Sequence, residues 1–149
     1  MLYRFAKATD SRLLASMNQQ LIQDENHRNP MNLAELERRM AEWLGGHYQA
    51  VVFEEESLAC GYALFRDEPE HIYLRHFYVD RNHRRRGIGR AAVGWLCRHV
   101  WNDDRRIRVD VLVGNEAGIA FWKSVGFGEY SLALEKEASK GCMINRKAA

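Results

Sequence analysis

The sequence predicts an α+β fold in α/β/α layers, with a mixed, mostly antiparallel central sheet and helices on both faces. Two observations favour this class. Apolar residues recur at helical spacing in four segments, and in six others they alternate or run together as in strands. The elements follow the order βααβββαβαβ, which favours helices packed on one sheet. A chain of 149 residues with 46% apolar content suits one domain, so we expect a single domain over residues 1–139 and a flexible basic tail over 140–149.

The N-terminal part predicts one strand and two helices. Residues 2–6 form a short apolar run typical of a strand, and leucines and a methionine then recur at helical spacing over 13–21. The polar stretch 23–30 ends in proline and breaks this first helix. A second apolar stripe predicts a helix over 33–44, with Asn32 as its N-cap.

The rest of the chain predicts a meander, a long helix and a strand-helix-strand unit. Strand-like runs cover 49–53, 60–65 and 72–79, with acidic or proline-containing turns between them. Helical spacing then covers residues 87–101 and 117–125. The strict alternation over 106–113 predicts a strand with one buried face, and 129–137 is typical of a final strand.

Composition excludes several classes of function. The formal net charge of +2 is too small to indicate a nucleic-acid or membrane partner. No run of about 18 apolar residues could span a bilayer, and the N-terminus does not have the pattern of a signal peptide. Three cysteines without a Cys-x-x-Cys pair, and histidines without an i, i+4 pair on a helix, argue against a metal site. We expect a soluble, cytoplasmic protein without bound metal.

A glycine-containing turn separates the third strand of the meander from the long helix. It reads Arg84-Arg85-Arg86-Gly87-Ile88-Gly89-Arg90. Glycine adopts positive φ and lets the backbone approach a ligand, and the first N–H groups of a helix carry partial positive charge. A pyrophosphate fits such a turn, although its spacing is neither a Walker A motif nor a dinucleotide fingerprint. A basic capping turn with solvated arginines, or a short nucleic-acid patch, remains open at this point.

Two motifs resemble one family. Arg84-x-x-Gly87-x-Gly89 resembles the Arg/Gln-x-x-Gly-x-Gly/Ala signature of the GNAT acetyltransferase superfamily, and as in that family it follows a strand ending in Phe77-Tyr78-Val79. The segment from Asn115 to Phe127 resembles the Asn-x-x-Ala-x-x-Phe-Tyr-x-x-x-Gly-Phe segment of the same family. The order of elements is also similar, so the resemblance covers nearly the whole chain.

The resemblance implies an N-acetyltransferase that moves an acetyl group from acetyl-CoA to a primary amine by direct attack in a ternary complex. The implied acceptor is a small-molecule or peptide amine, whose identity the residues do not reveal. They also do not distinguish an acetyl from a longer acyl donor, or a monomer from a homodimer. A rival is a non-catalytic acyl-CoA-binding or sensing module of the same fold, and a third reading is a nucleic-acid-binding domain that uses the arginines.

The resemblance also implies which residues contact the cofactor. The turn backbone would hold the CoA pyrophosphate, the pantetheine arm would follow the strand edge at Phe77–Val79, and Asn115 would contact that arm. One N–H group of the strand would stabilise the charge that develops on the acetyl oxygen. The implied cofactor-binding residues are Phe77, Tyr78, Val79, Arg84, Arg85, Arg86, Gly87, Ile88, Gly89, Arg90, Asn115, Phe121 and Trp122.

The catalytic groups cannot simply be carried over, because two positions depart from the family pattern. Arg75 stands about where a Glu often serves as the base. Trp122 stands where a Tyr usually protonates the leaving thiolate, which an indole N–H group cannot do near neutral pH; it is either packed along the cofactor or a buried helix residue. The candidate catalytic residues are His76, Tyr78 and Glu25, and the other candidate bases are His71, Glu70 and His27.

Overall fold

The computed structural model describes residues 1–102 and 104–138. Within them, a five-stranded sheet has the order β1-β2-β3-β4-β5. Its strands are β1 (Leu2–Phe5), β2 (Tyr48–Glu55), β3 (Leu58–Asp67), β4 (His71–Val79) and β5 (Arg106–Val109). Neighbouring strands are antiparallel except β4 and β5, which are parallel.

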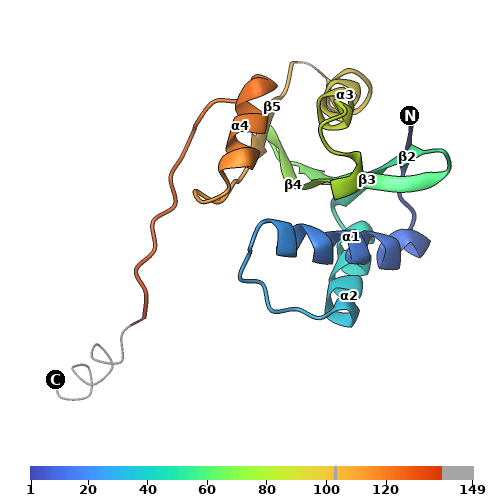
Figure 1. The fold of residues 1–149 in the computed structure, drawn as a ribbon, viewed down its shortest axis with the longest axis horizontal. Helices are drawn as coiled ribbons and strands as arrows, with labels where there is room; N and C mark the ends of the chain where they lie inside the picture. Colours follow the sequence, from blue (N-terminus) through green and yellow to red (C-terminus); the bar gives the residue numbers. More distant parts are fainter. Residues whose placement is uncertain (103, 139–149) are drawn as a thin grey trace.

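Helices cover both faces of this sheet. They are α1 (Ser11–Asp24), α2 (Leu33–Leu44), α3 (Ile88–Leu96) and α4 (Glu116–Ser124). Figure 1 shows α1 and α2 on one face, and α3 and α4 on the other. Short 3₁₀ turns, Ala8–Asp10 and Arg81–His83, precede α1 and α3, and a π-helical turn, Cys97–Trp101, continues α3. The predicted class and layers are therefore confirmed.

Side chains of β2 fill both layers of the core, because residues of a strand point alternately to opposite faces. Val51 and Phe53 pack in a buried cluster with side chains of α3 and α4. The alternate residues Ala50 and Val52 pack in a second cluster with α1 and α2. The sheet is therefore the middle layer, and its strands are apolar on both faces.

Side-chain caps fix the starts of two helices, and the first of them is the Asn32 cap that the sequence predicts. The side chain of Asn32 accepts a hydrogen bond from the Glu35 N–H group at 2.9 Å, and the Glu35 carboxylate accepts from the Asn32 N–H group at 3.0 Å. This reciprocal pair satisfies two donors that the first turn of α2 leaves without an intrahelical partner. Asn115 caps α4 in a similar way, since its side chain accepts from the Gly118 N–H group at 3.0 Å.

A β-bulge in β4 changes the course of the sheet near its middle. Leu64 of β3 pairs with His76, but the next residue, Phe65, pairs with Leu74, so that Arg75 is the extra residue on β4. Bulges of this kind bend a strand and interrupt its ladder. On the other side of β4, pairing with β5 ends at Leu74 opposite Val109. The last part of β4, Phe77–Val79, consequently has no strand partner on the β5 side in the described chain.

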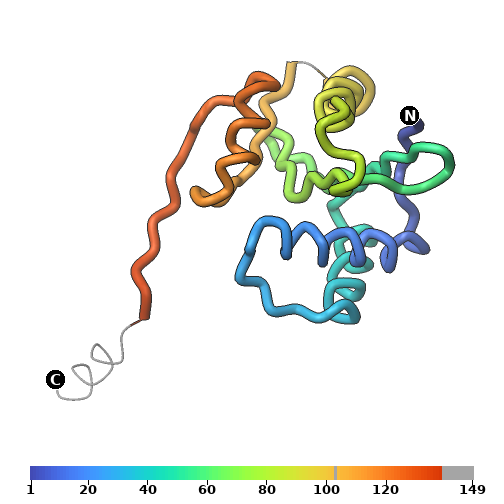
Figure 2. The backbone as a smooth tube through the Cα atoms, in the orientation of Figure 1, coloured from blue at the N-terminus to red at the C-terminus, as the bar shows by residue number. Residues whose placement is uncertain are grey.

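Two predicted strands differ from the structure. The strand predicted over 106–113 ends at Val109. Its pairing with β4 stops at Leu74 opposite Val109, so residues 110–113 have no ladder with β4. The final strand predicted over 129–137 is wrong: these residues form no strand in the described chain, and all of them are exposed. Figures 1 and 2 show this segment leaving the body of the molecule after α4. A strand needs a hydrogen-bonded neighbour, and this segment has no strand beside it among the described residues.

The sequence also predicts a flexible tail and no membrane-spanning segment. The predicted basic tail, residues 140–149, lies outside the described residues. Among the helices of the described residues, none is both long enough and apolar enough to cross a bilayer.

Candidate functional site

The turn before α3 presents backbone donors at the end of a helix. Gly87 is its N-cap residue and has φ +75°, a left-handed conformation that favours glycine. The first backbone bond of α3 runs from the Ala91 N–H group to the Gly87 carbonyl at 3.0 Å. The N–H groups of Ile88, Gly89 and Arg90 precede this bond and have no intrahelical acceptor. They form a site of partial positive charge that suits a phosphate oxygen.

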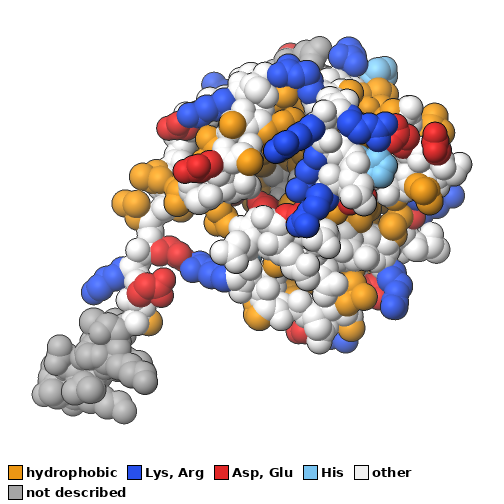
Figure 3. Space-filling view, in the orientation of Figure 1, with side chains coloured by type: hydrophobic (Ala, Val, Ile, Leu, Met, Phe, Trp, Pro, Cys, Tyr) orange, Lys and Arg blue, Asp and Glu red, His pale blue; other side chains and the backbone are white. Residues whose placement is uncertain are grey.

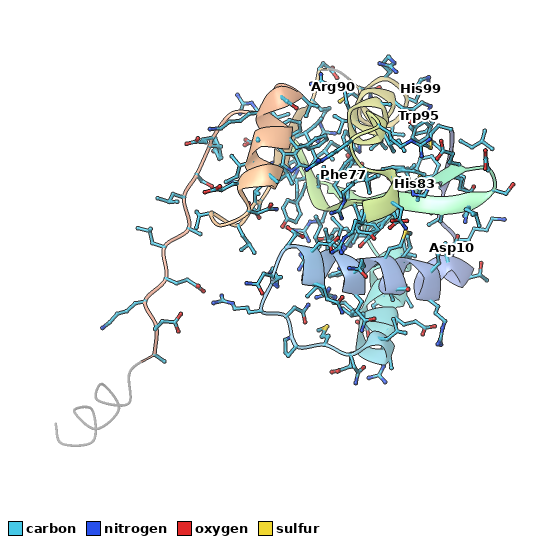
Figure 4. The ribbon with its side chains drawn as sticks, in the orientation of Figure 1. Asp10, Phe77, His83, Arg90, Trp95 and His99 are labelled. Carbon is cyan, nitrogen blue, oxygen red and sulfur yellow. The ribbon has the colours of Figure 1, made fainter. Side chains whose placement is uncertain are left out.

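Gly89 is needed because aromatic rings lie against it. A Cβ atom at this position would lie 3.0 Å from the Phe121 ring. Phe121, on α4, stacks on Phe77 of β4 with the ring centroids 5.8 Å apart. Figure 4 shows Phe77 between α4 and the turn that begins α3. The two sequence motifs therefore meet at β4, although they lie far apart along the chain.

Basic side chains gather over the beginning of α3, as Figure 3 shows, but most of them bind groups of the protein itself. Arg84 donates from Nε to the Val79 carbonyl at 2.8 Å and also binds the Asp24 carboxylate. Arg81 donates to the same carboxylate at 3.1 Å. These arginines therefore connect the turn to β4 and to the end of α1.

Two other arginines of the turn are also engaged. Arg86 makes a bidentate pair with Glu55 of β2 at 3.0 and 3.1 Å. Arg90 donates to the Ser124 carbonyl at the end of α4 at 2.8 Å. Arg85 differs, because it is exposed and has φ +62°, and its side chain has no partner among the described residues. Of the turn's arginines, Arg85 is the one whose guanidinium is available to a ligand without breaking another contact.

The edge of β4 continues the site from the turn. Phe77–Val79 lies immediately before the turn and has no strand beside it on the β5 side, within the residues that the structure describes. Alternate backbone groups of a strand point to this edge, where they can bind an extended ligand as a neighbouring strand would. Asn115 is the N-cap residue of α4, the helix whose Phe121 ring stacks on Phe77. Its Oδ1 atom is used in the cap, and its amide N–H groups remain available for an acceptor.

Trp122 is buried on α4 and is 8% exposed. Its ring packs edge-on against Phe77 at 5.1 Å and against Phe127 at 4.8 Å, measured between centroids. Of the two alternatives from the sequence, the structure favours the buried helix residue. The indole therefore packs against the Phe77 ring and helps to hold it in place.

On the opposite face of the sheet, polar side chains cluster beneath β4. The Nδ1 atom of His76 lies 3.0 Å from the Tyr62 hydroxyl of β3. The pKa of His76 is lowered from 6.5 to about 3 by burial, and then by the positive charges of Arg39 and Arg75 and by His27. Burial likewise raises the pKa of the Tyr62 hydroxyl well above 10. Both groups are therefore neutral near pH 7, and His76 is a weak base.

Glu25 is half-buried at the end of α1. Burial raises its pKa above 4.5, and the neighbouring Asp24 carboxylate raises it further. Its charge also raises the pKa of the buried Tyr62 hydroxyl, the group that lies 3.0 Å from His76. A carboxylate with a raised pKa accepts a proton near neutral pH more readily than an ordinary one, as a general base must.

Tyr78 faces the same side of the sheet as Tyr62, because it is one residue away from Phe77 on the strand. Burial raises its pKa above 10, with contributions from the carboxylates of Asp80 and Asp24. The Arg84 guanidinium lies 5.9 Å from the centre of its ring. The phenol keeps its proton at neutral pH and can donate it.

The structure separates two candidate bases from this cluster. Glu70 and His71 lie at the other end of β4, where His71 helps to line a cavity of about 380 Å³. Phe77 lies six positions beyond His71 along the strand, which corresponds to roughly 20 Å at 3.3 Å per residue. The cavity at that end is lined by Arg66, Glu68, His71, Tyr73, Arg108 and Asp110. We therefore drop both residues as candidate bases.

A second cavity, of about 290 Å³, is lined in part by the residues that directly follow Glu25 in the chain. The loop after α1, the loop after β5 and the C-terminal segment contribute to its walls, through Asn26, His27, Arg28, Leu112 and Glu135. His27 thus borders this cavity and also acts on His76. Within the described residues, no group of three or more His, Cys, Asp or Glu side chains could hold a metal ion.

The sequence missed two residues that organise the site. Tyr62 lies in an apolar strand, and nothing local indicates that its hydroxyl would lie within hydrogen-bond distance of His76. Asp24 is one of many polar residues at the end of α1, and its role depends on arginines about 60 positions later. The one signal in the sequence that could have suggested this role for Asp24 is that a cluster of arginines needs acidic partners.

Comparisons with known proteins agree with this geometry. The model of the acetyltransferase (GNAT) family matches residues 15–127. No curated protein matches the sequence significantly. A possible acetyltransferase from Clostridium difficile 630 has a similar structure, with a TM-score of 0.74 and 17% identity over 93% of this chain and 97% of that one.

Two further solved structures are similar and contain a ligand. A predicted acetyltransferase from Clostridium acetobutylicum, determined with acetyl-CoA, has a TM-score of 0.73 and 21% identity over 91% of this chain and 95% of that one. The aminoglycoside N-acetyltransferase AAC(6')-Iy in complex with CoA has a TM-score of 0.73 and 16% identity over 92% and 93%. At these identities the likeness is one of fold.

Proposed function

Because the chain belongs to the acetyltransferase (GNAT) family, we propose that it transfers an acetyl group from acetyl-CoA to the primary amine of a small molecule or peptide. The observation that carries this proposal is the free edge of β4 at Phe77–Val79 beside the start of α3. One continuous site thus offers strand groups for a pantetheine arm and helix N–H groups for a pyrophosphate. Similar folds determined with acetyl-CoA or CoA support the donor.

The residues of the turn fit the phosphates of acetyl-CoA. The N–H groups of Ile88, Gly89 and Arg90 would bind pyrophosphate oxygens, and Arg85 would add a charge-assisted hydrogen bond. The other arginines of the turn hold its shape through Asp24, Glu55 and the Ser124 carbonyl. Asn115 would donate its amide to the pantetheine arm. The use of acetyl-CoA suits the cytoplasmic location that we expect from the sequence.

We assign the base to Glu25. A protonated amine has to lose its proton before it attacks, and a base is effective when its pKa lies near the working pH. The pKa of His76 is about 3, which makes it a weaker base than an ordinary histidine. The pKa of Glu25 is shifted in the useful direction, and the next three residues of the chain, Asn26, His27 and Arg28, line the cavity of about 290 Å³ that would admit the acceptor.

The reaction then follows from these positions. The acceptor ammonium gives a proton to Glu25, directly or through water, and its nitrogen attacks the thioester carbon. The new C–N bond forms and the C–S bond breaks, while a strand N–H group of Phe77–Val79 stabilises the negative oxygen of the tetrahedral intermediate. The thiolate leaves and takes a proton from Tyr78 or water. The nitrogen, on becoming an amide, releases its second proton, which restores the Tyr78 phenol or passes to water. A thiol pKa of roughly 8.5 makes this departure possible without a strong acid.

Two measurements test the proposal. Calorimetry should detect binding of both acetyl-CoA and CoA, and failure to bind either would reject the cofactor assignment and favour the nucleic-acid reading. Thiol release should then accelerate with at least one member of a panel of simple amines, aminoglycosides and peptide N-termini. Binding without any acceleration would favour the acyl-CoA-binding or sensing module instead.

A further inference from the structure

Two arginines on the face of the sheet that α1 and α2 cover have only neutral partners. Arg39 of α2 donates to the Asn18 side-chain oxygen at 3.2 Å, and Arg75 of β4 donates to the Tyr48 hydroxyl at 3.3 Å. Both guanidiniums lie against the Trp43 ring, 4.3 and 4.6 Å from its centroid. This face therefore holds two positive charges that no carboxylate of the described residues neutralises by an ion pair.

The β-bulge in β4 directs Arg75 to this face. Consecutive residues of a regular strand point to opposite faces. Arg75 and its neighbour His76 nevertheless both contact Trp43, since the His76 ring lies 5.5 Å from the Trp43 ring between centroids. Bulges re-aim side chains in this way beside active sites. Arg75 stands two residues before Phe77, or roughly 7 Å along the strand. The bulge therefore presents a cation near the strand edge where the proposed reaction takes place.

The two guanidiniums need an anion more than the protein supplies one. The Nε atom of Arg39 is buried and has no hydrogen-bond partner in the described chain, although buried polar groups are normally paired. Burial lowers the pKa of Arg39, and the positive charge of Arg75 lowers it further, so the two side chains repel each other. Arg75 is exposed, so a ligand can reach it from solvent. An anionic oxygen group bound by both arginines would accept their hydrogen bonds and offset this repulsion.

The opposite charge, on Glu25, acts on the same pair of buried groups as the arginines do. The Tyr62 hydroxyl lies 3.0 Å from the Nδ1 atom of His76. The charge of Glu25 raises the pKa of this hydroxyl, whereas that of Arg39 lowers it. Arg39 and Arg75 both lower the pKa of His76. The proposed base and the two guanidiniums therefore surround one polar cluster, where an ammonium group and an anionic group would each meet the opposite charge.

We propose that the acceptor is a small amine that also carries an anionic oxygen group, a carboxylate or a phosphate, which Arg75 and Arg39 bind while Glu25 takes the proton of the ammonium group. This inference rests on the acetyl transfer proposed above and narrows its acceptor to zwitterionic amines. A planar guanidinium binds such a group through two parallel hydrogen bonds, and stacking on Trp43 holds its plane. Acceptors that carry only positive charges are disfavoured, because they meet the like charge of the arginines.

Matched pairs of acceptors test this specificity. Glycine, β-alanine and γ-aminobutyrate are compared with their carboxamides, and phosphoethanolamine with ethanolamine. For the best pair, kcat/KM should favour the anionic member by about thirtyfold, as for one charge-assisted contact. Arg75→Gln should reduce this preference at least about tenfold, and Arg75→Lys should restore part of it. Arg38→Gln makes the same change in net charge at an exposed position of α2 and should keep the preference. Equal rates within every pair, or a preference that survives Arg75→Gln, would overturn the proposal.

A binding measurement separates this inference from the proposed function. With CoA saturating the phosphate site, each anionic amine of the panel is titrated while NMR follows the Trp43 indole N–H group and the His76 ring. At least one anionic amine should shift both signals, and its neutral counterpart should not. Arg39→Gln should weaken this binding by about tenfold, whereas Arg38→Gln should bind like the wild type.

The outcomes of the two experiments differ for the two proposals. Binding of an anionic amine without acetylation of any amine would support the anion site and reject acetyl transfer. Acetylation of amines without any shift from the anionic ones would support acetyl transfer and overturn the acceptor class proposed here. Circular dichroism of each variant should match that of the wild type, so that a loss of binding reports on the site.

Discussion

The carboxylate of Asp24, in the last turn of α1, accepts a hydrogen bond from the guanidinium of Arg84, in the turn that leads into α3. Arg81 binds the same carboxylate. Burial of Asp24 would raise its pKa, but the hydrogen bonds from Gln20 and the two arginines hold the pKa below its usual range. The proposed phosphate site and the proposed base at Glu25 are therefore connected through one buried carboxylate.

We expect Asp24→Asn to act on the donor site through Arg84. Loss of the negative charge leaves Arg81 and Arg84 without their ionic partner, so the turn before α3 is no longer held against α1. The KM for acetyl-CoA should rise about threefold to tenfold with a smaller change in kcat, as for the loss of one charge-assisted contact. Asp67→Asn is the control, because Asp67 pairs with Arg105 in an exposed position. Equal effects of the two variants on KM would contradict a positioning role.

Gly89→Ala should weaken acetyl-CoA binding. The new Cβ atom would lie 3.0 Å from Phe121, so the helix start or the ring must move. We expect a loss of about tenfold in affinity by calorimetry, because a shift of the N–H groups weakens several phosphate contacts together. Gly94→Ala lies in the same helix and meets only the flexible end of Arg98, so it should bind like the wild type. Unchanged affinity of Gly89→Ala for acetyl-CoA would show that the turn does not take part in binding.

The pH dependence of the rate tests Glu25. Its pKa is raised in the folded protein, so the active carboxylate forms as pH rises through a value above 4.5. We expect kcat/KM to fall on the acid side of that pKa. Glu25→Gln should remove this limb and lower kcat by about a hundredfold, in the usual range for loss of a general base.

The controls for Glu25 separate catalysis from structure. Glu42→Gln changes an exposed residue of α2 and should not alter the profile. Glu25→Asp should keep the acid limb with a reduced rate. Since burial disfavours the charged form of Glu25, Glu25→Gln should not lower the free energy of unfolding near pH 7. An unchanged pH profile in Glu25→Gln would assign the base elsewhere.

His76 should stay neutral far below the usual range for histidine. Its pKa is about 3 in the folded protein, compared with 6.5 ordinarily. The unfolded chain binds a proton that the folded chain does not, so this residue lowers the free energy of unfolding as pH falls from 6.5 toward 3. NMR of the ring should show no titration of His76 above pH 5 in the folded protein. The urea-unfolded chain, titrating near 6.5, is the control; a folded-state midpoint near 6 would contradict the buried environment.

The sequence alone identified the parts of the site that are local. Gly87 and Gly89 stand between a strand and a helix, and free N–H groups exist at any helix start, so the donor-side turn could be read from neighbouring residues. Asn115 also stands at the start of a helix, within a motif that could be read from neighbouring residues. The fold class followed from the periods of the apolar residues, since a period of two or of 3.6 already says which face is buried.

The tertiary structure alone decided which groups meet. The sequence could not tell that Asp24 and Glu55 would engage the arginines of the turn, or that Tyr62 would face His76, because such pairs depend on strand register and helix packing. The same reason explains why the prediction of a strand over 129–137 was wrong. Alternation fixes which side chains share a face, but a strand exists only where an edge accepts its hydrogen bonds, and no period in the sequence specifies that edge.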